Sequence, residues 1–132
     1  MAIKITIDSK IICKDDANPV KKAAENLRRD IKKVCKKSDE KGCNIVLVQD
    51  DMESEQFEII AVRESLEIHA GDDLGFVYGI YHVSKEILGV LPFWFWNDQI
   101  FEKQSAYSVP DSYDYISKPY RVKYRGWFVN DE

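Results

Sequence analysis

Two acidic residues at the end of the chain are the first candidates for catalysis. Asp131 and Glu132 closely follow Trp127, Phe128 and Val129, a run typical of a buried strand. A pair of carboxylates could flank one glycosidic bond at roughly 5 to 10 Å and hydrolyse it. Neighbouring side chains on a strand point to opposite faces, however, so these two cannot both serve one site. At most one of them can be a site residue, and its catalytic partner is not in this sequence.

The two histidines lack the neighbours that a metal or nucleophilic site needs. His69 is out of phase with the apolar Leu66 and Ile68, so it should face away from their side of a strand. His82 is expected to share a helix face with Glu86. Neither histidine has another His or a Cys at ligand spacing, and neither is paired with a Ser or Cys nucleophile. We therefore predict surface or interface histidines, no metal site and no cofactor.

Three glycines at four-residue intervals in "GDDLGFVYG" invite comparison with nucleotide-binding loops. A dinucleotide loop needs G-x-G-x-x-G between a strand and a helix, and a phosphate-binding loop needs G-K-[ST]. Gly71, Gly75 and Gly79 match neither pattern. Their spacing instead places Gly75 and Gly79 on one side of a helix, where the missing side chains let a neighbouring backbone come close. We predict a packing role for them.

The aromatic run Phe93, Trp94, Phe95 and Trp96 could stack on sugar rings or on a protein partner. In a strand, Trp94 and Trp96 would share one face and the two phenylalanines the other. Aromatic side chains on both faces favour packing between two layers, or against a second domain, over an open sugar platform.

The composition argues against several classes of function. The 132 residues, 45% hydrophobic and 32% charged, suffice for one domain with its own core. A net charge of −4 opposes nucleic-acid binding, and acidic residues interrupt the basic stretch from Lys21 to Lys41, as on a solvated helix face. No apolar run reaches the roughly 18 residues of a membrane span, and no secretion signal is visible, so we expect a cytoplasmic protein without membrane contact. Cys13, Cys35 and Cys43 lack C-x-x-C spacing and are expected to be reduced, mostly buried thiols.

Hydrophobic periodicity predicts the elements that position these residues. Asn18 can cap a first helix that ends before Gly42, and Asp72 or Asp73 can cap a second helix that Pro92 stops. The run at 44–49 is expected to be a central strand covered on both faces. Together the pattern predicts an α/β fold of the α+β type, a mixed β-sheet with two amphipathic helices packed on one face. The expected strands are 3–7, 11–13, 44–49, 57–62, 66–70 and 93–96. In the first of them Ile3, Ile5 and Ile7 face the core, and Lys4, Thr6 and the following Asp8 face solvent.

Three stretches carry a resemblance to a known family. "SLEIHAGDDLGFVYGIYHVSKEIL" resembles the strand, turn and helix that end the small N-terminal α/β domain preceding the catalytic (β/α)8 barrel in several glycoside hydrolases, including hexosaminidases and α-glucuronidases. "LGVLPFWFWND" and "KYRGWFVNDE" are similar to glycoside hydrolase family 115, the xylan α-glucuronidases that remove 4-O-methylglucuronic acid or glucuronic acid branches. The resemblance is good from about Ser65 to Glu132 and only topological before that.

The resemblance implies three parts: an α/β accessory domain at 1–92, an aromatic strand and linker strap at 93–119, and the start of the first barrel strand at 120–132. In this family the polar end of that strand approaches the active-site mouth, so Asn130 and Asp131 would help to bind substrate in a full enzyme. Tyr78, Trp94 and Trp96 are expected at the interface with the barrel. No catalytic residue is expected in this chain, because the barrel that carries the acid and base is missing.

The function expected from this resemblance is structural: a non-catalytic accessory domain whose partners are the catalytic barrel of the same parent chain and, through that barrel, a carbohydrate substrate. One alternative is a freestanding carbohydrate-binding module that uses surface aromatics. Another is a complete small enzyme, which the shortage of paired nucleophile, base and metal ligands disfavours. An exposed strand edge or the C-terminal strand could also pair two copies into a homodimer.

Overall fold

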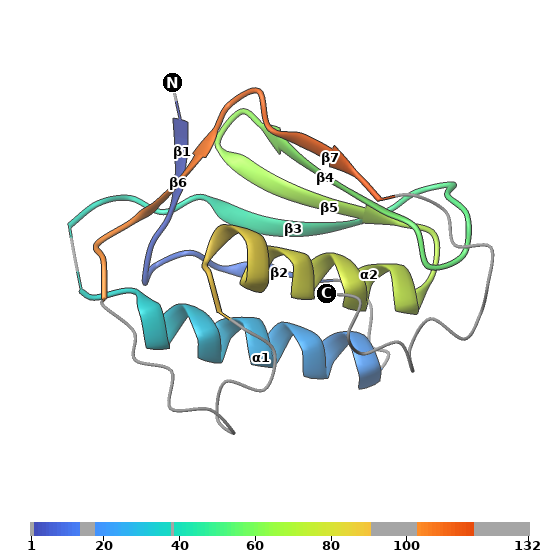
Figure 1. Cartoon of the computed structure of the whole chain (residues 1–132), viewed down its shortest axis with the longest axis horizontal. Coiled ribbons are helices and arrows are strands. Elements are labelled where there is room, and N and C mark those ends of the chain that lie inside the picture. Colours follow the sequence, from blue (N-terminus) through green and yellow to red (C-terminus); the bar gives the residue numbers. More distant parts are fainter. Residues whose placement is uncertain (1, 14–17, 38, 91–102, 118–132) are drawn as a thin grey trace.

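A computed structural model describes residues 2–13, 18–37, 39–90 and 103–117 of this chain (Figure 1). Within these ranges the expected α+β fold is confirmed, with mixed strands and two α-helices. The elements are β1 (Ala2–Ile5), β2 (Ile11–Ile12), α1 (Asn18–Val34), β3 (Asn44–Gln49), β4 (Phe57–Val62), β5 (Ser65–Ala70), α2 (Asp73–His82), the π-helical turn η1 (Val83–Ile87), β6 (Tyr107–Pro110) and β7 (Asp114–Ile116).

The main sheet has five strands in the order β2-β3-β5-β4-β7. β2, β3 and β5 run parallel, and β4 is antiparallel to both of its neighbours, β5 and β7. β4 and β5 form the expected hairpin, in which Val62 pairs with Ser65 across a turn that places Arg63 at φ 55°. α1 and α2 pack side by side on one face of this sheet (Figure 1). The hydrophobic core lies between that face and the two helices.

The first strand belongs to a separate two-stranded sheet, in which Ile3 of β1 pairs with Val109 of β6. This strand ends at Ile5, so the expectation of a strand over 3–7 with Thr6 in solvent is wrong. Thr6 is fully buried because the chain turns there: the Thr6 amide donates to Ser9 Oγ at 3.0 Å, and the Ser9 amide donates to the Thr6 carbonyl at 3.0 Å. These local hydrogen bonds replace strand pairing at Thr6, so the strand ends before it.

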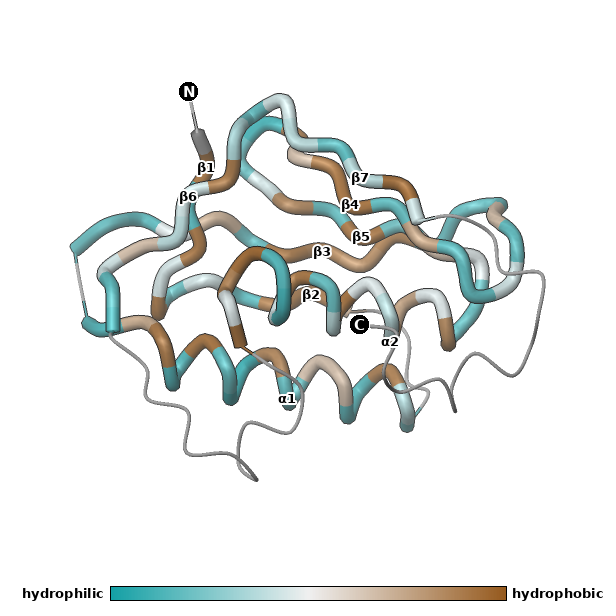
Figure 2. The backbone as a smooth tube through the Cα atoms, in the orientation of Figure 1, coloured by the Kyte–Doolittle hydropathy of each residue, from teal (hydrophilic) through white to brown (hydrophobic). Residues whose placement is uncertain are grey.

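α1 presents the amphipathic pattern that its sequence predicts. Figure 2 shows its hydrophobic positions on the side turned towards the sheet and its hydrophilic positions on the side turned away. The lysines between Lys21 and Lys41 are exposed, as expected for a solvated helix face. Asp30 is an unexpected member of the buried side at 5% exposure, and an ion pair with Arg29 at 3.1 Å compensates its charge.

The glycines of "GDDLGFVYG" have the predicted packing role. A Cβ at Gly75 would lie 2.6 Å from the carbonyl oxygen of Gln56, and one at Gly71 would lie 2.4 Å from that of Met52. A Cβ at Gly79 would meet Ile68 Cγ2 at 2.6 Å. α2 can therefore rest on β4 and β5 only because these positions lack side chains.

Asp72 is the N-cap of α2, as predicted, and it also fastens the loop at 50–56. Its carboxylate accepts hydrogen bonds from the Gly75 amide at 2.9 Å, from Ser54 Oγ at 2.7 Å and from the Glu55 amide at 3.2 Å. Burial raises the pKa of Asp72, but these three hydrogen bonds outweigh burial, so the net pKa is lowered. The helix start and the loop thus share one anchor.

Removing this anchor is expected to destabilise the chain at neutral pH. Asp72→Ala should lower the free energy of unfolding by about 1–2 kcal/mol, because the helix loses its cap and the loop loses two hydrogen bonds. Asp72→Asn keeps a capping oxygen but no charge, so it should recover only part of this loss. Since the folded-state pKa is lowered, the advantage of wild type over Asp72→Asn should be present above the ordinary pKa of 3.8 and be lost as the pH falls through the lowered folded-state pKa. Urea unfolding of the three proteins at pH 7 and pH 3 tests this, and equal stability of wild type and Asp72→Ala at pH 7 would contradict it.

β3 lies inside the sheet between β2 and β5, but the prediction of a strand covered on both faces does not match the described residues. Ile45 and Leu47 are buried against the helices, whereas Val46 and Val48 are only partly buried. Both α1 and α2 lie on the same side of the sheet, so Val46 and Val48 point to the opposite side, which we call the outer face (Figure 1).

Candidate functional site

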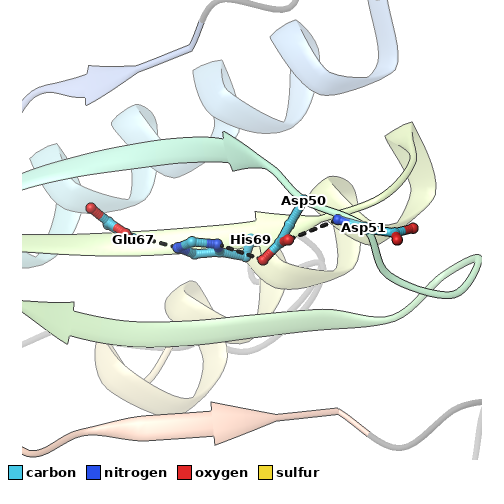
Figure 3. Close-up of polar contacts among 4 residues, drawn as sticks. All are labelled: Asp50, Asp51, Glu67 and His69. Atoms are coloured by element: carbon cyan, nitrogen blue, oxygen red, sulfur yellow. Dashed lines mark hydrogen bonds and ion pairs between the residues drawn. The ribbon is translucent and has the colours of Figure 1, made fainter.

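A group of charged side chains in mutual contact lies on the outer face, around His69 (Figure 3). Glu67 and His69 are two residues apart on β5, so their side chains share a face. Asp50 follows β3, whose last residue, Gln49, pairs with Ala70 of β5. The parallel pairing of β3 and β5 therefore brings Asp50 beside His69. We call Asp50, Glu67 and His69 the histidine cluster.

Both ring nitrogens of His69 are engaged by carboxylates. Nδ1 lies 3.0 Å from Asp50 Oδ2, and Nε2 lies 2.7 Å from Glu67 Oε1. Only the imidazolium form can donate at both nitrogens, since a neutral imidazole carries a single N–H. Burial lowers the pKa of His69, but the hydrogen bonds and charges of Glu67 and Asp50 outweigh burial, so the net pKa is raised above 6.5. The hydrogen bond from the Asp51 amide, followed by that from His69, lowers the pKa of Asp50.

Two further carboxyl groups extend this acidic surface. Glu58 of β4 is directly opposite His69, and Asp114 lies on the neighbouring strand β7. A hydrogen bond with Asp114 raises the pKa of Glu58, and burial and the charge of Asp114 act in the same direction. The neighbouring carboxyl group thus makes ionisation of Glu58 less favourable, because two like charges repel at close range.

The chemistry available to this surface is charge compensation and hydrogen bonding. Because both nitrogens of His69 are occupied, the imidazole has no free lone pair for a metal or for proton abstraction. In the described part of the chain, no three or more His, Cys, Asp or Glu side chains are grouped so as to hold a metal ion.

The second histidine, His82, lies in an aromatic stack on the face of the sheet that the helices cover, next to the edge strand β7. The ring of His82 stacks on Tyr115 with centroids 4.2 Å apart, and Phe57 lies 5.6 Å from it. Nε2 of His82 is 3.3 Å from the Tyr113 hydroxyl. Burial is the main reason why the pKa of His82 is lowered, so this ring is neutral at pH 7. It packs β7 against α2.

The thiols are poor candidates for catalysis. Cys35 and Cys43 are buried and Cys13 is half-buried, so the prediction of mostly buried cysteines is confirmed. Burial raises the pKa of Cys35, and it raises the pKa of Cys43 to about 11. Neither buried thiol forms an appreciable amount of thiolate at neutral pH.

Of the residues that sequence reasoning selected as site residues, only Tyr78 lies within the described ranges. Tyr78 lies half-buried on α2, next to the exposed Leu74 and Tyr81, which are 46% and 49% exposed. Trp94 and Trp96 lie outside the described residues, as do Asn130 and Asp131. Their proposed roles therefore stay predictions. No helix within the described ranges has the length and apolar composition to cross a membrane.

Sequence reasoning placed His69 on the correct face but missed both of its partners. The spacing of Glu67 and His69 on one strand was a usable signal. The contact with Asp50 had no such signal, because it depends on β3 and β5 being neighbours although β4 separates them in sequence.

Comparison with known proteins shows a likeness in fold. Neither protein-family models nor curated protein sequences match this chain. A solved structure of a family GH115 4-O-methyl-α-glucuronidase with specificity for decorated arabinogalactans matches with a TM-score of 0.70 and 20% identity, over 90% of this chain and 18% of that one. A GH138 enzyme targeting pectin rhamnogalacturonan II matches 76% of this chain and 15% of its own, at 19% identity and a TM-score of 0.45. The chain thus has the fold of one domain of a GH115 enzyme and spans less than a fifth of that enzyme's length, which confirms the expected resemblance in fold.

Proposed function

We propose that this chain is a non-catalytic accessory domain of a larger glycoside hydrolase of the GH115 type, and that it supports the catalytic barrel of that enzyme. The single observation that carries the proposal is the match of 90% of this chain to only 18% of a 4-O-methyl-α-glucuronidase. The substrate that we propose for the parent enzyme is a polysaccharide with 4-O-methylglucuronic acid or glucuronic acid branches, with glucuronoxylan as the first candidate.

The chemistry of the described residues agrees with a non-catalytic role. A glycosidase needs two carboxyl groups separated by about 5 Å or more, one on each side of the bond to be cleaved. The histidine cluster uses its carboxylates to hold His69. We therefore assign the catalytic acid and base to the barrel of the parent protein.

The layer formed by α1 and α2, which we call the helix layer, supplies the surface that we propose for contact with the barrel. Leu74, Tyr78 and Tyr81 recur at helical spacing on α2, and the first and last of them are about half exposed. An apolar stripe of this kind on a helix otherwise packed in a core is typical of an interface. Trp94 and Trp96 are proposed to join Tyr78 there, and Asn130 and Asp131 to contact substrate.

Introduction of a charge on this stripe tests the proposed interface in the complete protein that carries this domain. Leu74→Lys is expected to lower its melting temperature by about 4 °C or more, since an unpaired lysine would be buried between domains. Ile12→Lys is the matched control, because Ile12 is also about 40% exposed but lies on β2, at the edge of the outer face. If both variants melt together with wild type, the helix layer does not contact the barrel.

Activity assays separate the proposed function from its alternative. The complete protein is expected to release uronic acid from glucuronoxylan, and decorated arabinogalactan should be assayed in parallel because the solved GH115 relative prefers it. The 132-residue chain alone should release none. Tyr81 and Tyr115, 49% and 40% exposed, favour a carbohydrate-binding module as the second candidate. A shift of tryptophan fluorescence when xylo-oligosaccharides are titrated into the isolated chain would support that candidate instead.

A further inference from the structure

We propose that the histidine cluster is a pH-sensitive latch that holds the loop at 50–56 on the sheet, closed while His69 carries its proton and loosened when His69 loses it. The proposal concerns this domain alone and does not rest on the function of a parent enzyme. It starts from the position of Asp50, the first residue of the loop that links β3 to β4.

The loop is fastened at two separate points. At its far end, Ser54 and the Glu55 amide donate to Asp72, the cap of α2. At its near end, the Asp50 amide donates to the Ala70 carbonyl at 2.9 Å, and the Asp50 carboxylate contacts His69. Both anchors at the near end are on β5. The contact between Asp50 and His69 is therefore the side-chain link that can be switched without breaking the backbone pairing of the sheet.

The surroundings of His69 make its charge decisive. Acidic groups surround it on three elements: Asp50 from the loop and Glu67 on β5 contact the ring, and Glu58 on β4 is directly opposite it, whereas the neighbouring strand β3 presents the uncharged Val48. The strands β3, β4, β5 and β7 contain no Lys or Arg, so His69 is the one side chain on them that can be positive. When it becomes neutral, one of its two hydrogen bonds loses its donor and the carboxylates repel one another.

The direction of the pH dependence follows from the two partners. The pKa of His69 is raised by folding, so its contribution is fully present below the ordinary value of 6.5 and is lost as the pH rises through the folded-state pKa. The pKa of Asp50 is lowered, so its contribution is present above the ordinary value of 3.8 and is lost as the pH falls through the lowered folded-state pKa. The latch is closed between the folded-state pKa of Asp50 and that of His69, which includes mildly acidic solution.

Native-state hydrogen exchange of the 132-residue chain tests the latch directly. The protection factors of the Asp50 and Gln56 amides, corrected for the intrinsic pH dependence of exchange, should fall by up to about fivefold as the pH is raised through the His69 titration, which NMR measures independently. In His69→Gln this fall should be absent, because a neutral amide does not titrate. Asp50→Asn should loosen the same amides at pH 6, whereas Asp51→Asn, with an equal change in charge, should leave them protected.

Three outcomes would overturn the proposal. The first is a pKa of His69 at or below 6.5 in the folded chain. The second is protection of the loop amides that stays constant through the titration of His69, or that falls equally in His69→Gln. The third is equal loss of protection in Asp50→Asn and Asp51→Asn, which would show that general acidity of the surface, and no specific contact with His69, controls the loop.

Discussion

Replacement of Gly75 by alanine is expected to lower the free energy of unfolding by about 2–3 kcal/mol. The added Cβ would lie 2.6 Å from the Gln56 carbonyl oxygen and 2.9 Å from Ala70 Cβ, so either α2 or the start of β4 must move. Backbone atoms at this distance cannot turn aside as the end of a flexible side chain can. The better helix propensity of alanine, worth about 1 kcal/mol, offsets only part of this cost. Urea unfolding followed by circular dichroism measures the change.

Gly89→Ala is the matched control for this prediction. Gly89 has a φ of 76°, and a Cβ there would have nothing within 4 Å, so its substitution carries a conformational cost of about 1–2 kcal/mol without a clash. Gly75→Ala should therefore be the more harmful of the two. The reverse order would mean that α2 does not approach the β4 backbone as closely as the structure indicates.

Local sequence signals were sufficient for the elements whose partners are close in sequence. Four features were predicted from residues close together in sequence. They are the apolar stripe of α1, the β4–β5 hairpin, the Asp72 cap and the close packing at Gly75. The pairing of β1 with β6 could not be foreseen in this way. Ile3 and Val109 are more than a hundred residues apart, and a strand's own pattern does not specify which distant edge it joins.

At the candidate site, too, contacts within one strand could be predicted from the sequence and contacts between distant segments could not. The alternation of Glu67, Ile68 and His69 on β5 predicts that the histidine points away from the core, and it does. The contact with Asp50 could not be predicted, since it requires the strand order β3-β5-β4. The residues that were inferred from family resemblance, Trp94, Trp96, Asn130 and Asp131, lie outside the described residues, so their roles rest on that resemblance alone.

The two faces of the sheet should respond very differently to the same substitution. Ile59 and Ile60 are neighbours on β4, but Ile59 is fully buried under the helices and Ile60 points to the outer face, where it is partly exposed. Ile59→Ala is expected to cost about 3–4 kcal/mol, from lost burial and the cavity left behind. Ile60→Ala should cost about 1 kcal/mol, because less apolar area returns to water. Chemical denaturation of both variants provides the comparison, and the loss of β propensity is the same in each.

The variants Ile59→Ala and Ile60→Ala also test whether the outer face is exposed to solvent in the complete protein. If the barrel packs on the helix layer, as we propose, Ile60→Ala should cost the same in the isolated chain and in the complete protein. A larger cost in the complete protein would mean that another part of it covers the outer face. A larger cost in the isolated chain that grows with protein concentration would instead indicate a homodimer through this face, because the stability of a dimer depends on concentration. Equal costs for Ile59→Ala and Ile60→Ala under all conditions would contradict a two-layer fold with one covered face.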